Sequence, residues 1–267
     1  MKIINICNLK GGVAKTITSV NLSYVLTAIY KKKVLVIDND KQGNASKFFG
    51  VYGYDHDSLA EIMLQKAKAE DVIMTTENER IDIIPANMNL LTANRSVMLD
   101  LNSPQQTRIK KALQPVMSNY DYCIIDNAPD INMSVINALV AGDAYIIPVK
   151  IDRFTFDGVD VMIEQAEQIR ENFNEKLRFM GCLVTSFRRN DVNRQGQEYL
   201  ADADKYHLFA HHIRWTEKVD ESTFTCEPVM VHSPRCGAAQ DYKKFTAELL
   251  QELGDVSDSD KKGERKA

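Results

Sequence analysis

Short apolar runs alternate with longer segments of helical periodicity along the first 150 residues of the chain. This alternation is typical of a parallel sheet that helices cover on both faces. Most of the runs are rich in β-branched residues, and several lack polar alternation, as expected of strands buried on both faces. The predicted strands are Ile3–Asn8, Val34–Asp38, Ile81–Pro85, Tyr122–Asp126, Ala144–Val149 and Phe179–Thr185.

The segment Lys15–Tyr30 gives the clearest helical pattern, because apolar residues recur at helical spacing and the other side is apolar too. A helix of this kind is covered on most of its circumference. The same periodicity predicts further helices at Leu59–Ala69, Gln105–Ser118, Asn132–Ala141, Gly158–Phe173, Gln195–Tyr206 and Gln240–Leu253. Together these elements predict a doubly wound, mostly parallel α/β fold.

The length of 267 residues suits a single α/β domain, which we place at residues 1–253. No repeat and no low-complexity linker marks off a second folded domain. Residues 254–267 hold four acids, four bases and a single bulky aliphatic residue. Such a segment cannot bury a core, so it is expected to be a disordered polar tail.

The formal net charge of −4 excludes bulk positive charge as a means of holding nucleic acid or acidic lipid, although a local basic patch stays possible. No apolar run approaches the roughly 20 residues that cross a bilayer, so we expect a cytoplasmic protein without membrane contact. The five cysteines are too far apart for CxxC redox or zinc pairs and are expected to be reduced, scattered thiols.

Residues 10–16, KGGVAKT, lie between the first predicted strand and the first predicted helix. A strand that turns through glycines into a helix aims backbone N–H groups and the positive helix end at one point, which favours an anion. Lys15 is then placed for terminal phosphates, and Thr16 for Mg²⁺. The standard GxxxxGK[ST] pattern is broken by Leu9 and Ala14, so the motif alone leaves a simple tight turn open.

The same residues resemble the deviant Walker A loop, KGGxxK[ST], of the ParA/MinD group of P-loop ATPases. The resemblance implies that ATP and Mg²⁺ are the cofactors and that Lys10 reaches the phosphates of a partner's nucleotide in an ATP-dependent homodimer. It implies nucleotide contacts at Lys10, Gly11, Gly12, Val13, Ala14, Lys15, Thr16 and Ile17.

Two further motifs follow in the family's order. Residues 34–45 resemble a strand ending in DxDPQGN, with Lys41 in place of the proline, and residues 121–129 resemble the Walker B strand with Ala128 in place of its first proline. The resemblance implies that Asp126 holds a Mg²⁺-bound water, that Asp40 orients the attacking water, and that Asp38 supports the metal and the switch region. The residues themselves leave open that one of the two acids only caps the next helix.

The resemblance continues more weakly to Leu253. Residues 213–231 resemble a family loop that flanks the adenine, although its Pro-Arg pair is lost here, and Trp215 either stacks on a base or packs partly buried. DNA-binding members of the family use basic residues of the dimer. Lys218 falls on one such position and Arg188 and Arg189 near another, so the resemblance implies non-specific double-stranded DNA binding.

These features favour a slow, partner-stimulated ATPase that segregates a plasmid, chromosome or mobile element with a ParB-like protein and joins the nucleoid when ATP-bound. The alternative is a nucleotide-bound scaffold or transcriptional regulator of the same fold with little turnover. A MinD-like protein is disfavoured because the sequence of residues 254–267 lacks the apolar face that an amphipathic membrane helix needs. An iron protein is disfavoured because Cys123 is poorly placed to hold a cluster between subunits.

Overall fold

The computed structural model describes residues 1–152 and 155–255 and contains a seven-stranded sheet in the order β3-β4-β2-β5-β1-β6-β7. Every pairing is parallel except β3 with β4. The strands are β1 (Lys2–Ile6), β2 (Val34–Asn39), β3 (Met74–Thr75), β4 (Ile81–Ile84), β5 (Tyr122–Asn127), β6 (Ala144–Val149) and β7 (Arg178–Val184). The doubly wound, mostly parallel fold is confirmed.

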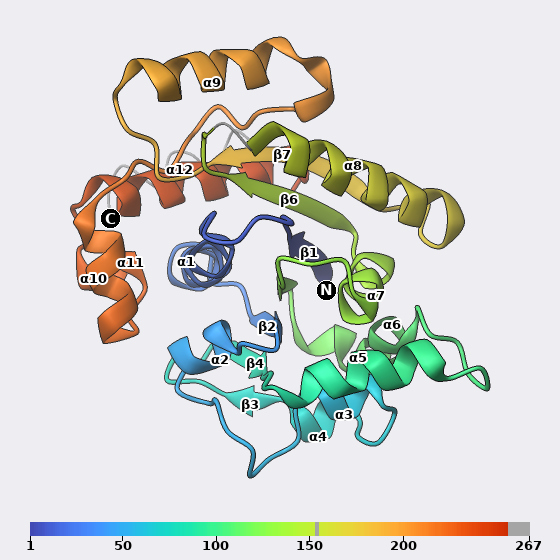
Figure 1. Ribbon diagram of the computed structural model, residues 1–267. Coiled ribbons are helices and arrows are strands. Elements are labelled where there is room, and N and C mark those ends of the chain that lie inside the picture. The colour runs from blue at the N-terminus through green and yellow to red at the C-terminus, as the bar shows by residue number, and fades with distance from the viewer. Residues whose placement is uncertain (153–154, 256–267) are drawn as a thin grey trace.

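Helices cover both faces of the sheet (Figure 1). One apolar cluster packs α1 and α12 against one face, and a second packs α3, α5 and α6 against the other. The helices are α1 (Lys15–Ala28), α2 (Asn44–Phe48), α3 (Leu59–Met63), α4 (Ala69–Val72), α5 (Asn89–Leu99), α6 (Arg108–Leu113), α7 (Met133–Ala141), α8 (Thr155–Asn172), α9 (Asp191–Asp202), α10 (Glu217–Thr225), α11 (Val229–His232) and α12 (Gly237–Glu252), with 3₁₀ turns η1 (Gln114–Asn119) and η2 (Asp204–Tyr206).

Helix α1 is enclosed as its periodicity predicts. Leu22 and Leu26 are fully buried in the cluster that joins the sheet to α12, and Thr18 lies 3.4 Å from the hydroxyl of Tyr242 on α12. Burial of each such leucine contributes about 1.5 to 3 kcal/mol. The helix that follows the glycine turn is therefore held firmly, and its first residues have a fixed position.

Two predicted helices are shorter than their sequence pattern suggests. The segment 105–118 becomes α6 followed by the 3₁₀ turn η1, because Pro115 lacks the N–H that an α-helix needs. The segment 59–69 ends as a helix at Met63, and Gln65 takes a left-handed backbone conformation with φ of 57°. The sequence pattern also fails to predict α5, α10 and the two-residue edge strand β3.

The carboxyl ends of three central strands meet at one edge of the sheet. Asp126 of β5 pairs in register with Ile6 of β1 on one side and with Asp38 of β2 on the other. In an open parallel sheet this edge is where ligands bind. The chain therefore carries the glycine turn and both acidic strand ends to the same place.

The chain's last described residues pack near its start. Asp255, the second residue of the predicted polar tail, accepts hydrogen bonds from Lys2 and from the hydroxyl of Tyr122. The rest of that predicted tail, residues 256–267, lies outside the described residues. Across the described part of the chain, no helix is long and apolar enough to cross a bilayer.

Candidate functional site

The loop that joins β1 to α1 contains two closely spaced departures from ordinary backbone geometry. Gly12 and Ala14 both take left-handed conformations, with φ of 72° and 64°. Ala14 is the N-cap of α1 and makes no side-chain hydrogen bond to the first turn. The N–H groups that open a helix need acceptors, and an anion is a suitable one because the helix dipole is positive there.

The loop is anchored to neighbouring strands by side chains that no sequence motif marks. Asn8 donates to the carbonyl of Pro148 on β6 at 2.8 Å and accepts from the N–H of Lys10 at 2.8 Å. The hydroxyl of Thr185, directly after β7, donates to the carbonyl of Val13 at 3.1 Å. These bonds fix the loop to β6 and to the residue that follows β7.

Lys15 lies inside this loop rather than in solvent. Its side chain donates to the carbonyl of Lys10 at 3.0 Å, and only 8% of the residue is exposed. Burial lowers the pKa of Lys15, while the nearby Asp126 and Asp40 oppose that shift. A buried ammonium group with a lowered pKa gains strongly from an anionic ligand.

Lys10 points its ammonium group to an acid of its own chain. It forms an ion pair with Asp152, which follows β6, and both side chains are partly exposed. Asp152 has a further interaction within the chain. No sequence motif marks Asp152 as a partner of Lys10.

Asp126 lies at the end of β5 and is fully enclosed. Burial raises its pKa to about 6, although hydrogen bonds from Thr16 and Ser19 and the charge of Lys15 act in the opposite direction. The Ser19 hydroxyl donates to its carboxylate at 3.0 Å. The structure thus brings the two residues expected at the metal, Thr16 and Asp126, into contact.

Asp38 lies beside Asp126 on β2 and shapes the loop that follows. Burial and the charge of Asp126 raise its pKa to about 7, against hydrogen bonds from Ser46 and Asp40. Both the N–H and the hydroxyl of Ser46 donate to it at 2.7 Å. Ser46 is in the first turn of α2, so Asp38 helps to cap this helix. Helix capping is the role that the sequence left open for one of the two acids.

Asp40 is less enclosed than Asp38 and stands at the mouth of the loop. Its carboxylate accepts from the N–H of Gln42 at 3.0 Å, and its carbonyl accepts from Gly43 at 2.8 Å. Its charge is also felt by Lys15 and Asp126. The aspartate expected to orient water therefore lies near the candidate metal ligands.

The donor set fits a magnesium ion that is held together with a phosphate ligand. Thr16 and Asp126 offer the hard oxygen donors that Mg²⁺ prefers, and this ion usually takes only one or two protein ligands. The described ranges contain no group of three or more His, Cys, Asp or Glu side chains able to hold a metal alone. The site therefore suits a metal that arrives with a nucleotide.

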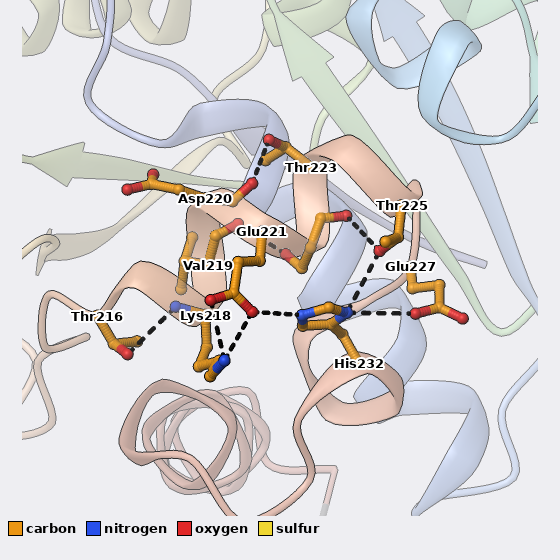
Figure 2. Close-up of polar contacts among 10 residues, drawn as sticks. Thr216, Lys218, Val219, Asp220, Glu221, Thr223, Thr225, Glu227 and His232 are labelled. Atoms are coloured by element: carbon orange, nitrogen blue, oxygen red, sulfur yellow. Dashed lines mark hydrogen bonds and ion pairs between the residues drawn. The ribbon is translucent and has the colours of Figure 1, made fainter.

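The residues expected to contact DNA lie on two elements. Arg188 and Arg189 are on the loop after β7, where the Arg188 guanidinium lies 4.1 Å from the ring centre of Trp215. Lys218 lies in the first turn of α10, where Figure 2 shows its ammonium group against Glu221, which also contacts His232. None of the residues expected to bind the nucleotide, 10–17, lies on these two elements.

The chain is similar to known proteins along most of its length. A family model described as an AAA domain matches residues 1–179. The sporulation initiation inhibitor protein Soj of Bacillus subtilis is 32% identical over 254 residues, which cover 93% of this chain and 98% of Soj. The chromosome partitioning protein ParA of Caulobacter vibrioides is 28% identical, covering 94% of each chain.

A similar fold occurs in solved structures. The cobyrinic acid a,c-diamide synthase of Mycobacterium smegmatis, solved with an ATP analogue and magnesium, has a TM-score of 0.82. It is 23% identical to this chain and covers 95% of it, with 96% of the synthase covered. That likeness supports the fold alone. The domain match and the identity with Soj show that this chain belongs to the ParA/Soj family of P-loop ATPases with a deviant Walker A loop.

Proposed function

We propose that this protein is a DNA-partition ATPase that dimerises around Mg-ATP. The observation that carries the proposal is the buried ammonium group of Lys15, held inside a left-handed glycine loop beside two buried strand-end carboxylates. Opposite charges enclosed at a helix N-terminus suit a triphosphate and its metal better than they suit a structural turn.

Nucleotide binding is assigned to the loop itself. Lys15 and the N–H groups of residues 11–17 hold the phosphates, and Thr16 and Asp126 hold the magnesium ion. The metal supplies neutralisation of phosphate charge. Phosphoanhydride hydrolysis needs little covalent help from a protein, so positioning and charge carry most of the catalysis. Lys15 is a catalytic residue in this sense.

Asp40 is proposed to orient the attacking water. Its carboxylate lies at the loop mouth, whereas Asp38 is fully buried and already accepts three hydrogen bonds from Ser46 and Asp40. Asp38 is therefore assigned to support the loop and the metal rather than to touch the water. This division of roles follows from how much each carboxylate is exposed.

Lys10 is proposed to act on the nucleotide of a second copy. It is a long, partly exposed side chain whose ion pair with Asp152 lies at the rim of the loop. Release from this pair frees the ammonium group for a phosphate across the dimer interface. Hydrolysis then removes the charge that Lys10 contacts, so the nucleotide state controls the dimer.

DNA binding and partition complete the proposal. Arg188, Arg189 and Lys218 are proposed to contact DNA backbone phosphates without reading sequence, and the dimer doubles their number. A ParB-like centromere-binding protein is the proposed partner and speeds a slow hydrolysis. The protein is then cytoplasmic and joins the nucleoid in its ATP-bound state.

The test combines DNA retention, dimer formation and phosphate release with ATP, ADP and no nucleotide, for wild type and Asp40→Ala. Wild type is expected to dimerise and retain DNA only with ATP. Asp40→Ala is expected to dimerise and retain DNA with ATP but release no phosphate. Normal turnover in this variant refutes the role of Asp40, and nucleotide-independent behaviour of wild type refutes the switch.

A further inference from the structure

A second hollow lies beside the loop that follows β7. It is a pocket of about 600 Å³ bounded by the loop after β7, by residues 210–215 and by α12. The described residues that line it include none from residues 8–17. The pocket therefore shares no described lining residue with the phosphate loop.

The pocket gathers positive charge that nothing on the described part of the protein neutralises. Arg188, Arg189 and Lys244 stand at its wall, and within residues 1–152 and 155–255 they form no ion pair. The other cation of the wall, Arg214, is paired with Asp241 at 2.6 Å. Three unpaired cations beside one neutral pair make a local positive field on a chain whose net charge is −4.

Aromatic rings set the position of one of these cations. The Arg188 guanidinium lies over the ring of Trp215, which is 41% exposed. Phe187 lies beside the His212 ring with ring centres 4.1 Å apart. A stacked guanidinium keeps its N–H groups free for phosphate oxygens, and less side-chain entropy is lost when it binds.

The positive charges around the pocket disfavour protonation of His212, which also lines it. Burial lowers the pKa of His212, and the charges of Arg214, His211 and Arg189 lower it further, with Asp241 opposing. His211 is held by Glu248 at 2.7 Å. Crowded cations of this kind indicate an anion as the missing partner.

Lys218 differs from these three cations. Its ammonium group lies 2.7 Å from Glu221, so a phosphate must first displace this carboxylate (Figure 2). Arg194, a few residues after Arg189 in the sequence, forms an ion pair with Asp191 at 2.9 Å. The available positive charge is therefore concentrated at the pocket rather than on α10.

We infer that this pocket is the principal DNA contact of the protein, taking backbone phosphates between Arg188, Arg189 and Lys244, with Trp215 at its edge. The inference rests on the proposed function, because it places the DNA of that proposal. Lys244 and Trp215 are the new members of the interface. The occupant is duplex DNA because phosphodiesters match three separate cations better than one small anion does.

The only tryptophan of the chain supplies the direct readout. Trp215 emission is measured in the Mg-ATP state while random-sequence duplex DNA is added at several salt concentrations. DNA is expected to change the emission along the same isotherm as DNA retention. A full emission change with Mg-ATP alone, and none with DNA, assigns the pocket to the nucleotide and overturns the inference.

Charge-removal variants test whether the cations bind phosphates. Arg189→Ala and Lys244→Ala are each expected to make log K fall less steeply with log salt, by about 0.9 for every phosphate that the variant no longer binds. Lys176→Ala is the matched control, since it removes one exposed cation beside the amino end of β7, at the opposite edge of the sheet. ATP-dependent dimerisation is measured in each variant to show that the fold and the switch survive.

The outcomes separate the two claims. If wild type retains no DNA with ATP, the proposed DNA binding fails and the inference fails with it. If wild type retains DNA but Arg189→Ala and Lys244→Ala match Lys176→Ala in affinity and salt slope, the inference alone is overturned. A larger loss of affinity in Lys218→Ala than in Lys244→Ala overturns it too, because α10 is then the main contact.

Discussion

At the scale of single residues, the phosphate loop combines strain with enclosed charge. Ala14 has φ of 64°, a conformation that costs a residue with a β-carbon about 1 to 2 kcal/mol. Lys15 is buried where burial lowers its pKa. The loop therefore stores unfavourable free energy, as expected at a functional site, and an anionic ligand offsets the part that comes from the buried charge of Lys15.

Ala14→Gly tests the strain. Glycine adopts the left-handed conformation without a steric cost, so the free energy of unfolding is expected to rise by about 1 kcal/mol. Urea unfolding of the nucleotide-free protein measures it. Ala247→Gly, in the interior of α12, is the control and is expected to lose about 1 kcal/mol. A loss of stability in both variants contradicts the assigned strain.

Lys15→Ala and Lys10→Ala test how the two lysines divide their work. Lys15→Ala is expected to weaken ATP binding by about 2 to 5 kcal/mol, because it removes a buried charge paired with the phosphates. Lys10→Ala is expected to bind ATP normally but to lose dimerisation or hydrolysis. Calorimetry, sedimentation and phosphate release measure these properties. If Lys10→Ala dimerises and releases phosphate as wild type does, the proposed contact of Lys10 with the partner's nucleotide is wrong.

At the scale of elements, the site is made where strand ends meet. Asp38 and Asp126 are in register on β2 and β5, and the N-terminus of α1 faces Asp126 through Lys15 and Ser19. Two buried carboxylates so close raise each other's cost of ionisation. This edge of the sheet is consequently less stable without a cation than with one.

Stability of the nucleotide-free, magnesium-free protein is expected to depend on pH through Asp38. Its pKa is raised from 3.8 to about 7, so the folded state binds the proton more tightly than the unfolded state. That contribution is complete below pH 3.8 and is lost as pH rises through about 7, with a slope of at most about 1.4 kcal/mol per unit.

Asp38→Asn removes this titrating group and supplies the comparison. Urea unfolding between about pH 5 and 8 is expected to show a shallower fall of stability with pH in the variant than in wild type. An equal pH slope in both proteins contradicts the raised pKa. Added magnesium is expected to flatten the wild-type slope, because a cation favours the ionised carboxylates.

Elements with a strong apolar pattern of their own could be predicted from the sequence. Features that depend on tertiary contacts or on local backbone geometry could not. The strands of the central sheet and α1 have strong apolar patterns, and the glycine loop lies in order between them. Pro115 shortened α6, and the turn at Gln65 ended α3 early, through local backbone geometry that periodicity does not show. The Lys10–Asp152 pair joins residues 142 positions apart, so no motif could reveal it.

At the scale of the whole molecule, one chain holds only part of the proposed machinery. In the proposed function, the loop and the strand ends form the phosphate and metal site, and a second copy adds Lys10. The Lys10–Asp152 pair keeps that cation on its own chain in this structure. In the proposed dimer, the contact of Lys10 with the partner's nucleotide therefore competes with its ion pair to Asp152. Asp152 is then expected to set the ATP concentration at which the dimer forms.

Asp152→Asn is expected to shift the dimer equilibrium. Removing the acid frees Lys10, and a partly exposed pair is worth about 0.2 to 1 kcal/mol, so half-maximal dimerisation should need roughly 1.5 to 5 times less ATP. Sedimentation at increasing ATP measures it. The doubly substituted protein, Lys10→Ala with Asp152→Asn, should behave as Lys10→Ala alone. A higher ATP requirement in Asp152→Asn contradicts this competition.

The most direct test is a crystal structure of the protein with magnesium and a non-hydrolysable ATP analogue. We predict a triphosphate bound by residues 10–17, a metal ion between Thr16 and Asp126, and Lys10 of the partner subunit on the same phosphates. A triphosphate bound anywhere else, or a dimer in which the partner's Lys10 stays on its own Asp152, contradicts this prediction.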